Sequence, residues 1–102
     1  MPKTGLNDHI IRKYLLLQAS NLERELVELR LLTDLHFLEY VEMVEDEMID
    51  DYVYNHLSPK DRLRFEQHFL FTPERIEKLR FAQALFIFLT EKRAQKKASS
   101  EA

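Results

Sequence analysis

The chain has no cysteine and no tryptophan, and it has only one glycine and three prolines among its 102 residues. Without cysteine it can form no disulfide, no thiolate metal site and no cysteine nucleophile, which is typical of proteins in a reducing compartment such as the cytoplasm. Sheets joined by tight hairpins need more turn residues than this composition supplies. Because Leu, Glu, Arg and Lys favour helices, we expect an all-α protein.

Long apolar runs and an excess of positive charge are also missing. The longest oily run, residues 84–89, is far too short to span a bilayer, and the N-terminal residues lack the apolar stretch of a signal peptide. A net charge of −3 argues against general nucleic-acid binding. We therefore expect a cytoplasmic chain with no membrane span of its own.

Helix-start signals divide the chain into short segments. Ser58 and Thr72 are each followed by a proline, and both are predicted caps, because a hydroxyl accepts from the free amides of a helix start while proline at the first position loses no hydrogen bond. Short connections favour one compact bundle over residues 1–95, followed by a polar tail at 96–102. The apolar spacing predicts five helices at about 8–18, 21–32, 35–57, 59–70 and 74–94.

An internal repeat is visible when the chain is shifted by 38 residues. Residues 11–48 then align with residues 49–86 without a gap, so that the two units share a long central helix. Chance agreement among helical residues is the alternative, but the shared tyrosine and shared cap favour a repeat. The identical pairs are Ile11/Ile49, Tyr14/Tyr52, Ser20/Ser58, Arg24/Arg62, Glu28/Glu66, Leu32/Leu70 and Glu39/Glu77.

Two neighbouring segments, EDEMIDDY at 45–52 and LSPKDRLRFEQHFL at 57–70, resemble the zinc-finger domain of bacterial anti-sigma factors. In that family a Leu-Ser-Pro cap opens a helix that carries Arg, Phe, Glu and a zinc-binding His. A Cys follows four residues after the His, and another three residues later. His68 matches the histidine, whereas the two Cys positions fall on Thr72 and Arg75.

The resemblance covers about residues 45–86 and implies a protein that binds an extracytoplasmic-function sigma factor and keeps it from RNA polymerase. Zinc needs about four ligands, usually thiolates and imidazoles in such sites. Since Thr72 is a poor ligand and Arg75 is a cation, we expect a member without metal or other cofactor. The family's usual membrane segment is absent from these residues, so the chain is either a soluble member or the cytoplasmic piece of a longer membrane-anchored protein.

The predicted long helix carries seven acidic residues and no basic one between Glu39 and Asp51. Like charges this dense repel, so the helix needs compensation from elsewhere. One interpretation is a docking face for a basic partner; the alternatives are a solvated face and internal pairing with basic residues further along the chain, Arg75 and Lys78 among them. The candidate partner-binding acids are Glu42, Glu45, Asp46, Glu47, Asp50 and Asp51.

The last predicted helix is apolar around most of its circumference. Phe81 and Phe88 lie off its main apolar stripe, so the helix needs burial on more than one side. The stripe consists of Ile76, Leu79, Ala82, Leu85, Phe86 and Leu89. The second side contacts either a partner, in which case both phenylalanines belong to the binding site, or another copy of the chain; alternatively, the helices at 8–18 and 35–57 cover both sides.

Catalytic and metal-binding patterns are absent from the sequence. The four histidines share no metal-ligand spacing, and there is no nucleophile elbow or Gly-rich phosphate loop. We therefore predict a non-catalytic protein-binding module that resembles an anti-sigma factor. The alternative is a helical adaptor or homodimerisation module that acts through its apolar C-terminal helix.

Overall fold

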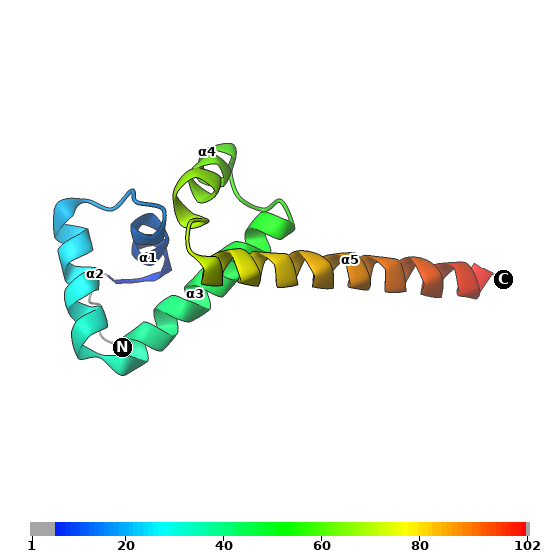
Figure 1. Cartoon of the computed structure of the whole chain (residues 1–102), viewed down its shortest axis with the longest axis horizontal. Coiled ribbons are helices and arrows are strands. Elements are labelled where there is room, and N and C mark those ends of the chain that lie inside the picture. The colour runs from blue at the N-terminus through cyan, green and yellow to red at the C-terminus, as the bar shows by residue number, and fades with distance from the viewer. Residues whose placement is uncertain (1–5, 102) are drawn as a thin grey trace.

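The computed structural model describes the backbone of residues 6–101 and the side chains of residues 6–95 (Figure 1). This part of the chain is built of helices and contains no strand, so the predicted all-α class is confirmed. The elements are α1 (Asp8–Leu15), α2 (Asn21–Thr33), α3 (Leu35–Val53), α4 (Pro59–Arg64), a π-helical turn η1 (Phe65–Phe69) and α5 (Pro73–Glu101).

The core lies among α1, α2, α3 and η1. We call residues 8–69, which run from α1 to η1 and include α4, the body of the molecule. Helices α1 and α2 pack against each other and on α3, while α4 and η1 lie over the other end of α3 (Figure 1). The buried side chains of the core come from the segments of the body other than α4, and the described part of α5 contributes none of them. They are Ile11, Leu15, Leu16, Val27, Phe37, Val41, Val44, Met48, Ile49, Phe65 and Phe69.

Helix α5 begins on α3 and then extends away from the body (Figure 1). It continues to Glu101, beyond the end predicted at about residue 94. The molecule measures 59 × 31 × 24 Å as a result. None of the described helices combines the length and the apolarity that a membrane crossing requires.

The first and third helices end earlier than predicted, and they end in the same way. Leu17 and Asn55 adopt left-handed backbone conformations with φ of 58° and 62°. The next amide donates to the carbonyl five residues back, Gln18 to Lys13 and His56 to Asp51, at 2.7 Å in both turns. These bonds form Schellman motifs, which close a helix and redirect the chain.

The 38-residue shift also relates tertiary contacts. The Tyr14 hydroxyl donates to Glu28 at 3.4 Å, and the equivalent Tyr52 hydroxyl donates to Glu66 at 2.6 Å. Arg64 joins α4 to the turn after α1, because its guanidinium donates to the carbonyl of Leu16 at 2.9 Å and to that of Leu17 at 2.8 Å.

Candidate functional site

A groove runs between the second half of α3 and the first half of α5. Its floor is apolar and its rim carries carboxylates, a combination typical of a surface that binds a segment with one apolar and one basic face. It is lined by Asp46, Ile49 and Asp50 from α3, and by Glu74, Glu77, Lys78, Phe81, Ala82 and Leu85 from α5.

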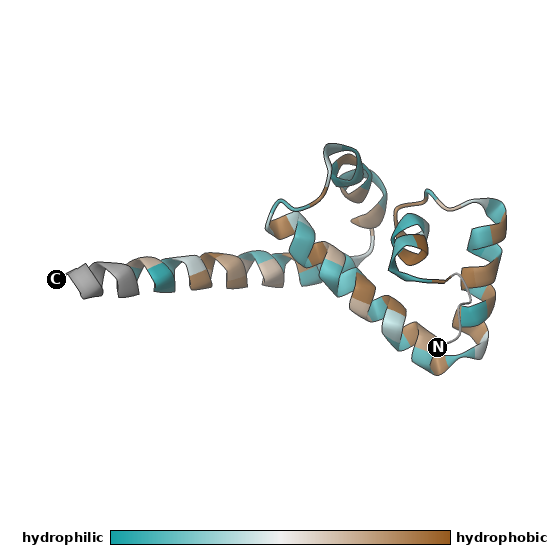
Figure 2. Ribbon diagram, turned by 180° about the vertical axis from the view of Figure 1, so that it is seen from behind, coloured by the Kyte–Doolittle hydropathy of each residue, from teal (hydrophilic) through white to brown (hydrophobic). Residues whose placement is uncertain are grey.

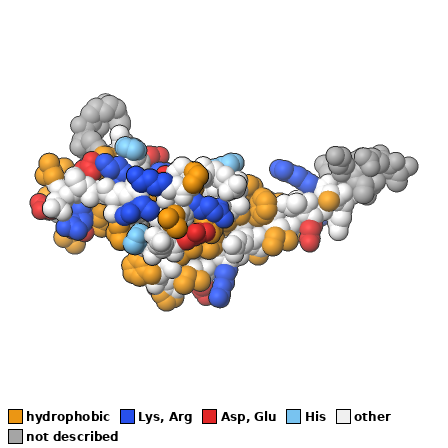
Figure 3. Space-filling model, turned by 90° about the horizontal axis from the view of Figure 1, so that it is seen from above, with side chains coloured by type: hydrophobic (Ala, Val, Ile, Leu, Met, Phe, Trp, Pro, Cys, Tyr) orange, Lys and Arg blue, Asp and Glu red, His pale blue; other side chains and the backbone are white. Residues whose placement is uncertain are grey.

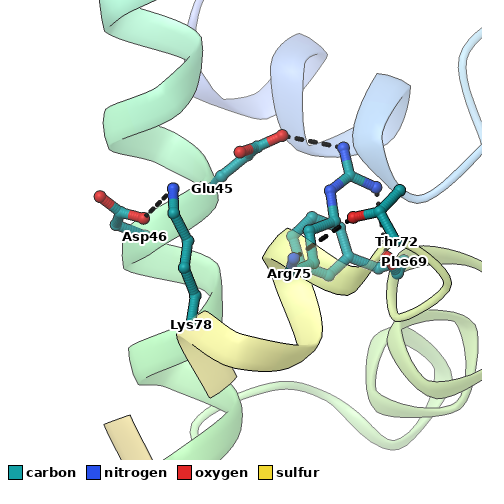
Figure 4. Close-up of polar contacts among 6 residues, drawn as sticks. All are labelled: Glu45, Asp46, Phe69, Thr72, Arg75 and Lys78. Atoms are coloured by element: carbon teal, nitrogen blue, oxygen red, sulfur yellow. Dashed lines mark hydrogen bonds and ion pairs between the residues drawn. The ribbon is translucent and has the colours of Figure 1, made fainter. Parts of the chain in front are cut away.

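Two ion pairs fix α5 on α3 at this groove (Figure 4). The Arg75 guanidinium lies 2.8 Å from a Glu45 carboxylate oxygen, and Lys78 Nζ lies 3.0 Å from Asp46 Oδ1. The Arg75–Glu45 pair is the less exposed one, with side chains only 20% and 17% accessible, so water screens it less than an ordinary surface pair. These contacts position the apolar side chains of α5 beside α3.

The candidate caps Ser58 and Thr72 lie immediately before the first residues of α4 and α5. Ser58 Oγ accepts from the amide of Asp61 at 3.1 Å, and Thr72 Oγ1 accepts from the amide of Arg75 at 3.3 Å. Both bonds have N-cap geometry, in which a hydroxyl satisfies an amide of the first helical turn. Thr72 therefore helps to set the direction in which α5 leaves the body.

The positions of the two family cysteines do not fit a zinc ion in this chain. Thr72 is engaged as a cap, and the Arg75 guanidinium lies 4.1 Å from the centre of the Phe69 ring while it also pairs with Glu45. His68 lines a separate hollow between the two repeated units. Within residues 6–95, no three His, Asp or Glu side chains are grouped in a way that could hold a metal ion.

The six candidate acids fall into two groups. Glu45, Asp46, Glu47 and Asp51 are in ion pairs within the chain, whereas Glu42 and Asp50 are exposed and have no ion-pair partner among the described residues. Internal pairing thus accounts for part of the acidic run. Of this set, the groove brings together only Asp46 and Asp50.

One cationic partner of the acidic run was not predicted. Arg12 on α1 lies 2.9 Å from Asp51 and 3.9 Å from Glu47. The basic residues predicted as partners follow the acids, whereas Arg12 precedes Glu47 by 35 positions and Asp51 by 39. The only sequence feature that relates Arg12 to the acidic run is the repeat. Its shift aligns Arg12 with Asp50, within the acidic run of the second unit.

The two candidate phenylalanines lie on an uncovered face of α5. Phe81 is 71% exposed, Phe88 is 47% exposed, and Leu85 between them is 46% exposed. The opposite face of the helix contacts the body through Leu79 and Ala82. The alternative in which the helices at 8–18 and 35–57 cover both sides of α5 is therefore wrong. Figure 2 shows apolar residues in brown along the part of α5 that leaves the body.

A second apolar face was missed by the sequence analysis. Leu22, Leu26 and Leu29 of α2 are exposed, although they follow one another at the four- and three-residue steps of a helix face. Val27 of the same helix is fully buried in the core, so α2 is apolar on two sides. The leucine spacing could have indicated this face. Figure 3 shows hydrophobic side chains on the surface of the body as well as along α5.

The resolved pKa shifts lie in the body, away from the groove. A hydrogen bond from the Ser20 amide lowers the pKa of Glu23, and the Arg30 guanidinium lowers the pKa of Asp34. The hydrogen bond to Glu66, followed by burial, raises the pKa of Tyr52. These shifts report structural contacts at helix ends and between helices.

In comparisons with known proteins, no family model, no curated protein and no solved structure matches this chain.

Proposed function

We propose that this protein is a non-catalytic, cytoplasmic binding module of the anti-sigma type, which sequesters an extracytoplasmic-function sigma factor and so regulates transcription. The observation that carries the proposal is the groove between α3 and α5, with an apolar floor and an acidic rim. The sequence resemblance over residues 45–86 supplies the class of partner.

The charge of the groove favours a basic partner. Lys78 is neutralised by Asp46, while Asp50, Glu74 and Glu77 on the rim have no ion-pair partner among the described residues. Unpaired carboxylates attract a basic surface at long range and raise the association rate, most strongly at low salt. A DNA-binding surface of a sigma factor has the required positive charge.

The apolar floor would hold the complex together. Phe81, the aromatic side chain that lines the groove, is 71% exposed, and large aromatic side chains that become buried at an interface contribute most of its binding energy. Because the ion pairs of Arg75 and Lys78 fix this part of α5 on α3, little ordering is required when a partner binds.

Co-expression of the full chain with an extracytoplasmic-function sigma factor, followed by pulldown, tests the proposal. We expect a stable complex that Phe81→Ser weakens by tenfold or more, on the order of 1.4 kcal/mol. Phe71→Ser is the matched control, since Phe71 is 69% exposed but lies outside the groove. No complex with any such sigma factor, or equal loss in both variants, would reject this site.

A charge variant tests the steering role separately. Asp50→Lys should slow association and reduce its dependence on salt, whereas Glu25→Lys, which makes the same charge change on the exposed face of α2, should have a smaller effect. Stopped-flow association rates at several salt concentrations measure the difference.

A further inference from the structure

The uncovered face of α5 carries one charged residue at each end, and the two charges have opposite signs. Phe81, Leu85 and Phe88 form its apolar centre, with Glu77 four residues before Phe81 and Lys92 four residues after Phe88. The successive steps are four, four, three and four residues, which keep all five side chains on one side of an α-helix. One end of this face is therefore acidic and the other is basic.

Neither charge is used within the described part of the chain. Glu77 and Lys92 are exposed, and no ion pair joins either of them to another described residue. Lys92 Nζ lies over the Phe88 ring, 5.9 Å from its centre. The two cannot pair with each other, because 15 residues of helix separate them by about 22 Å. The face is thus both apolar and electrostatically unsatisfied.

We propose that a second copy of this chain covers the face, with the two α5 helices packed antiparallel about a two-fold axis near residues 84 and 85. In this register Phe81 of one copy lies against Phe88 of the other, and Glu77 lies against Lys92. Each contact occurs twice, because a two-fold interface is the same patch on both subunits. The apolar centre loses its exposure and both charges gain a partner.

The antiparallel direction follows from the charges. A parallel pair would place Glu77 beside Glu77 and Lys92 beside Lys92, which is repulsive at both ends. An antiparallel pair brings the C-terminal half of each α5, with Lys92 and Arg93, toward the other copy's groove, where Asp50 and Glu74 lie on the rim. The helix dipoles also oppose each other favourably in this arrangement.

The antiparallel dimer accounts for the length of α5. Figure 1 shows that the helix leaves the body after its first turns, so its second half is free to reach another molecule. Because the second copy lies over the same groove as the proposed basic partner, the dimer and that complex exclude each other. The dimer itself is measured on the isolated chain, so it stands or falls separately from the proposed function.

Sedimentation equilibrium of the full chain and of charge-swapped variants tests the dimer. Glu77→Lys and Lys92→Glu each make both end contacts repulsive, and each should raise the dimer dissociation constant about tenfold. The double variant Glu77→Lys/Lys92→Glu should restore the wild-type value. A mixture of the two single variants should form a heterodimer, in which every end contact is again attractive.

Two exposed changes away from α5 serve as controls for net charge. Glu25→Lys and Lys60→Glu alter the charge by the same amounts as the single variants and should leave dimerisation unchanged, while thermal melts verify that all variants fold. In 1 M salt the single variants should approach the wild type, because screening removes the repulsion. A wild-type chain that stays monomeric at high concentration would overturn the proposal, as would failure of the double variant to recover.

Discussion

The body and α5 use their apolar residues in opposite ways. In the body, Phe65 and Phe69 are fully buried and their rings stack 4.6 Å apart. On α5, Phe81 and Phe88 are exposed, and the contacts of the helix with α3 involve only one of its faces. Phenylalanine thus stabilises the fold in the body and is available to a partner on α5. The two roles differ because the other helices surround the rings in the body but not those on α5.

The largest contrast should appear when one phenylalanine from each region is truncated. Phe65→Ala removes a fully buried ring that also stacks on Tyr52 at 4.5 Å, and it should lower the free energy of unfolding by about 3–5 kcal/mol. Phe81→Ala should change it by less than about 0.5 kcal/mol in the monomer. Urea denaturation at low protein concentration measures both. Equal losses would show that α5 belongs to the core.

The connection between the two regions depends on Arg75. Arg75→Met keeps part of the apolar stem over Phe69 but removes the bond to the Phe69 carbonyl and the ion pair with Glu45, so we expect a loss of about 1–3 kcal/mol. A double-mutant cycle with Glu45→Gln separates the ion pair from the other contacts. Additive effects of the two changes would mean that the ion pair does not stabilise the junction.

Removing a cap from each region should have a smaller effect. Ser58→Ala and Thr72→Ala each leave an amide of a first helical turn without its side-chain acceptor, and each should cost on the order of 1 kcal/mol. Thermal unfolding measures both. Unchanged melting temperatures in both cap variants would contradict these hydrogen bonds.

The smallest expected effects concern pH, and they should be confined to the body. The pKa of Asp34 is lowered in the folded state, chiefly by Arg30, so its contribution is present above the unfolded pKa and is lost as the pH falls through the folded pKa. Asp34→Asn should therefore flatten the decline in stability below about pH 4.

At alkaline pH the stability should fall as the pH rises, which is the opposite direction to the acid effect. The pKa of Tyr52 is raised by its hydrogen bond to Glu66, so its contribution is present below about pH 10 and is lost as the pH rises through the folded pKa. Tyr52→Phe should flatten the alkaline limb. Denaturation midpoints measured from acid to alkaline pH test both substitutions, and an unchanged pH profile in both would contradict the assigned contacts.

Local signals in the sequence predicted the helices but not all of their ends. A hydroxyl before proline predicted the starts of α4 and α5, because capping depends on residues only three positions apart. The left-handed residue at Leu17 was not predictable, since leucine has no preference for that conformation. The helix predicted at 59–70 ends in a π turn, which is closed by the bond from the Leu70 amide to the Phe65 carbonyl. No sequence signal indicated this turn.

The sequence by itself determined the helical class, the helix starts and the apolar character of α5, because periodicity and capping act over a few neighbouring residues. Only the tertiary structure decided which of the acids are neutralised and which face of α5 is covered. Arg12 contacts Asp51 from 39 positions away, and Phe81 is 71% exposed because the body lines one side of its groove without covering the ring. Both outcomes depend on how the helices pack, and helix packing brings together residues whose separation along the chain carries no signal of their contact.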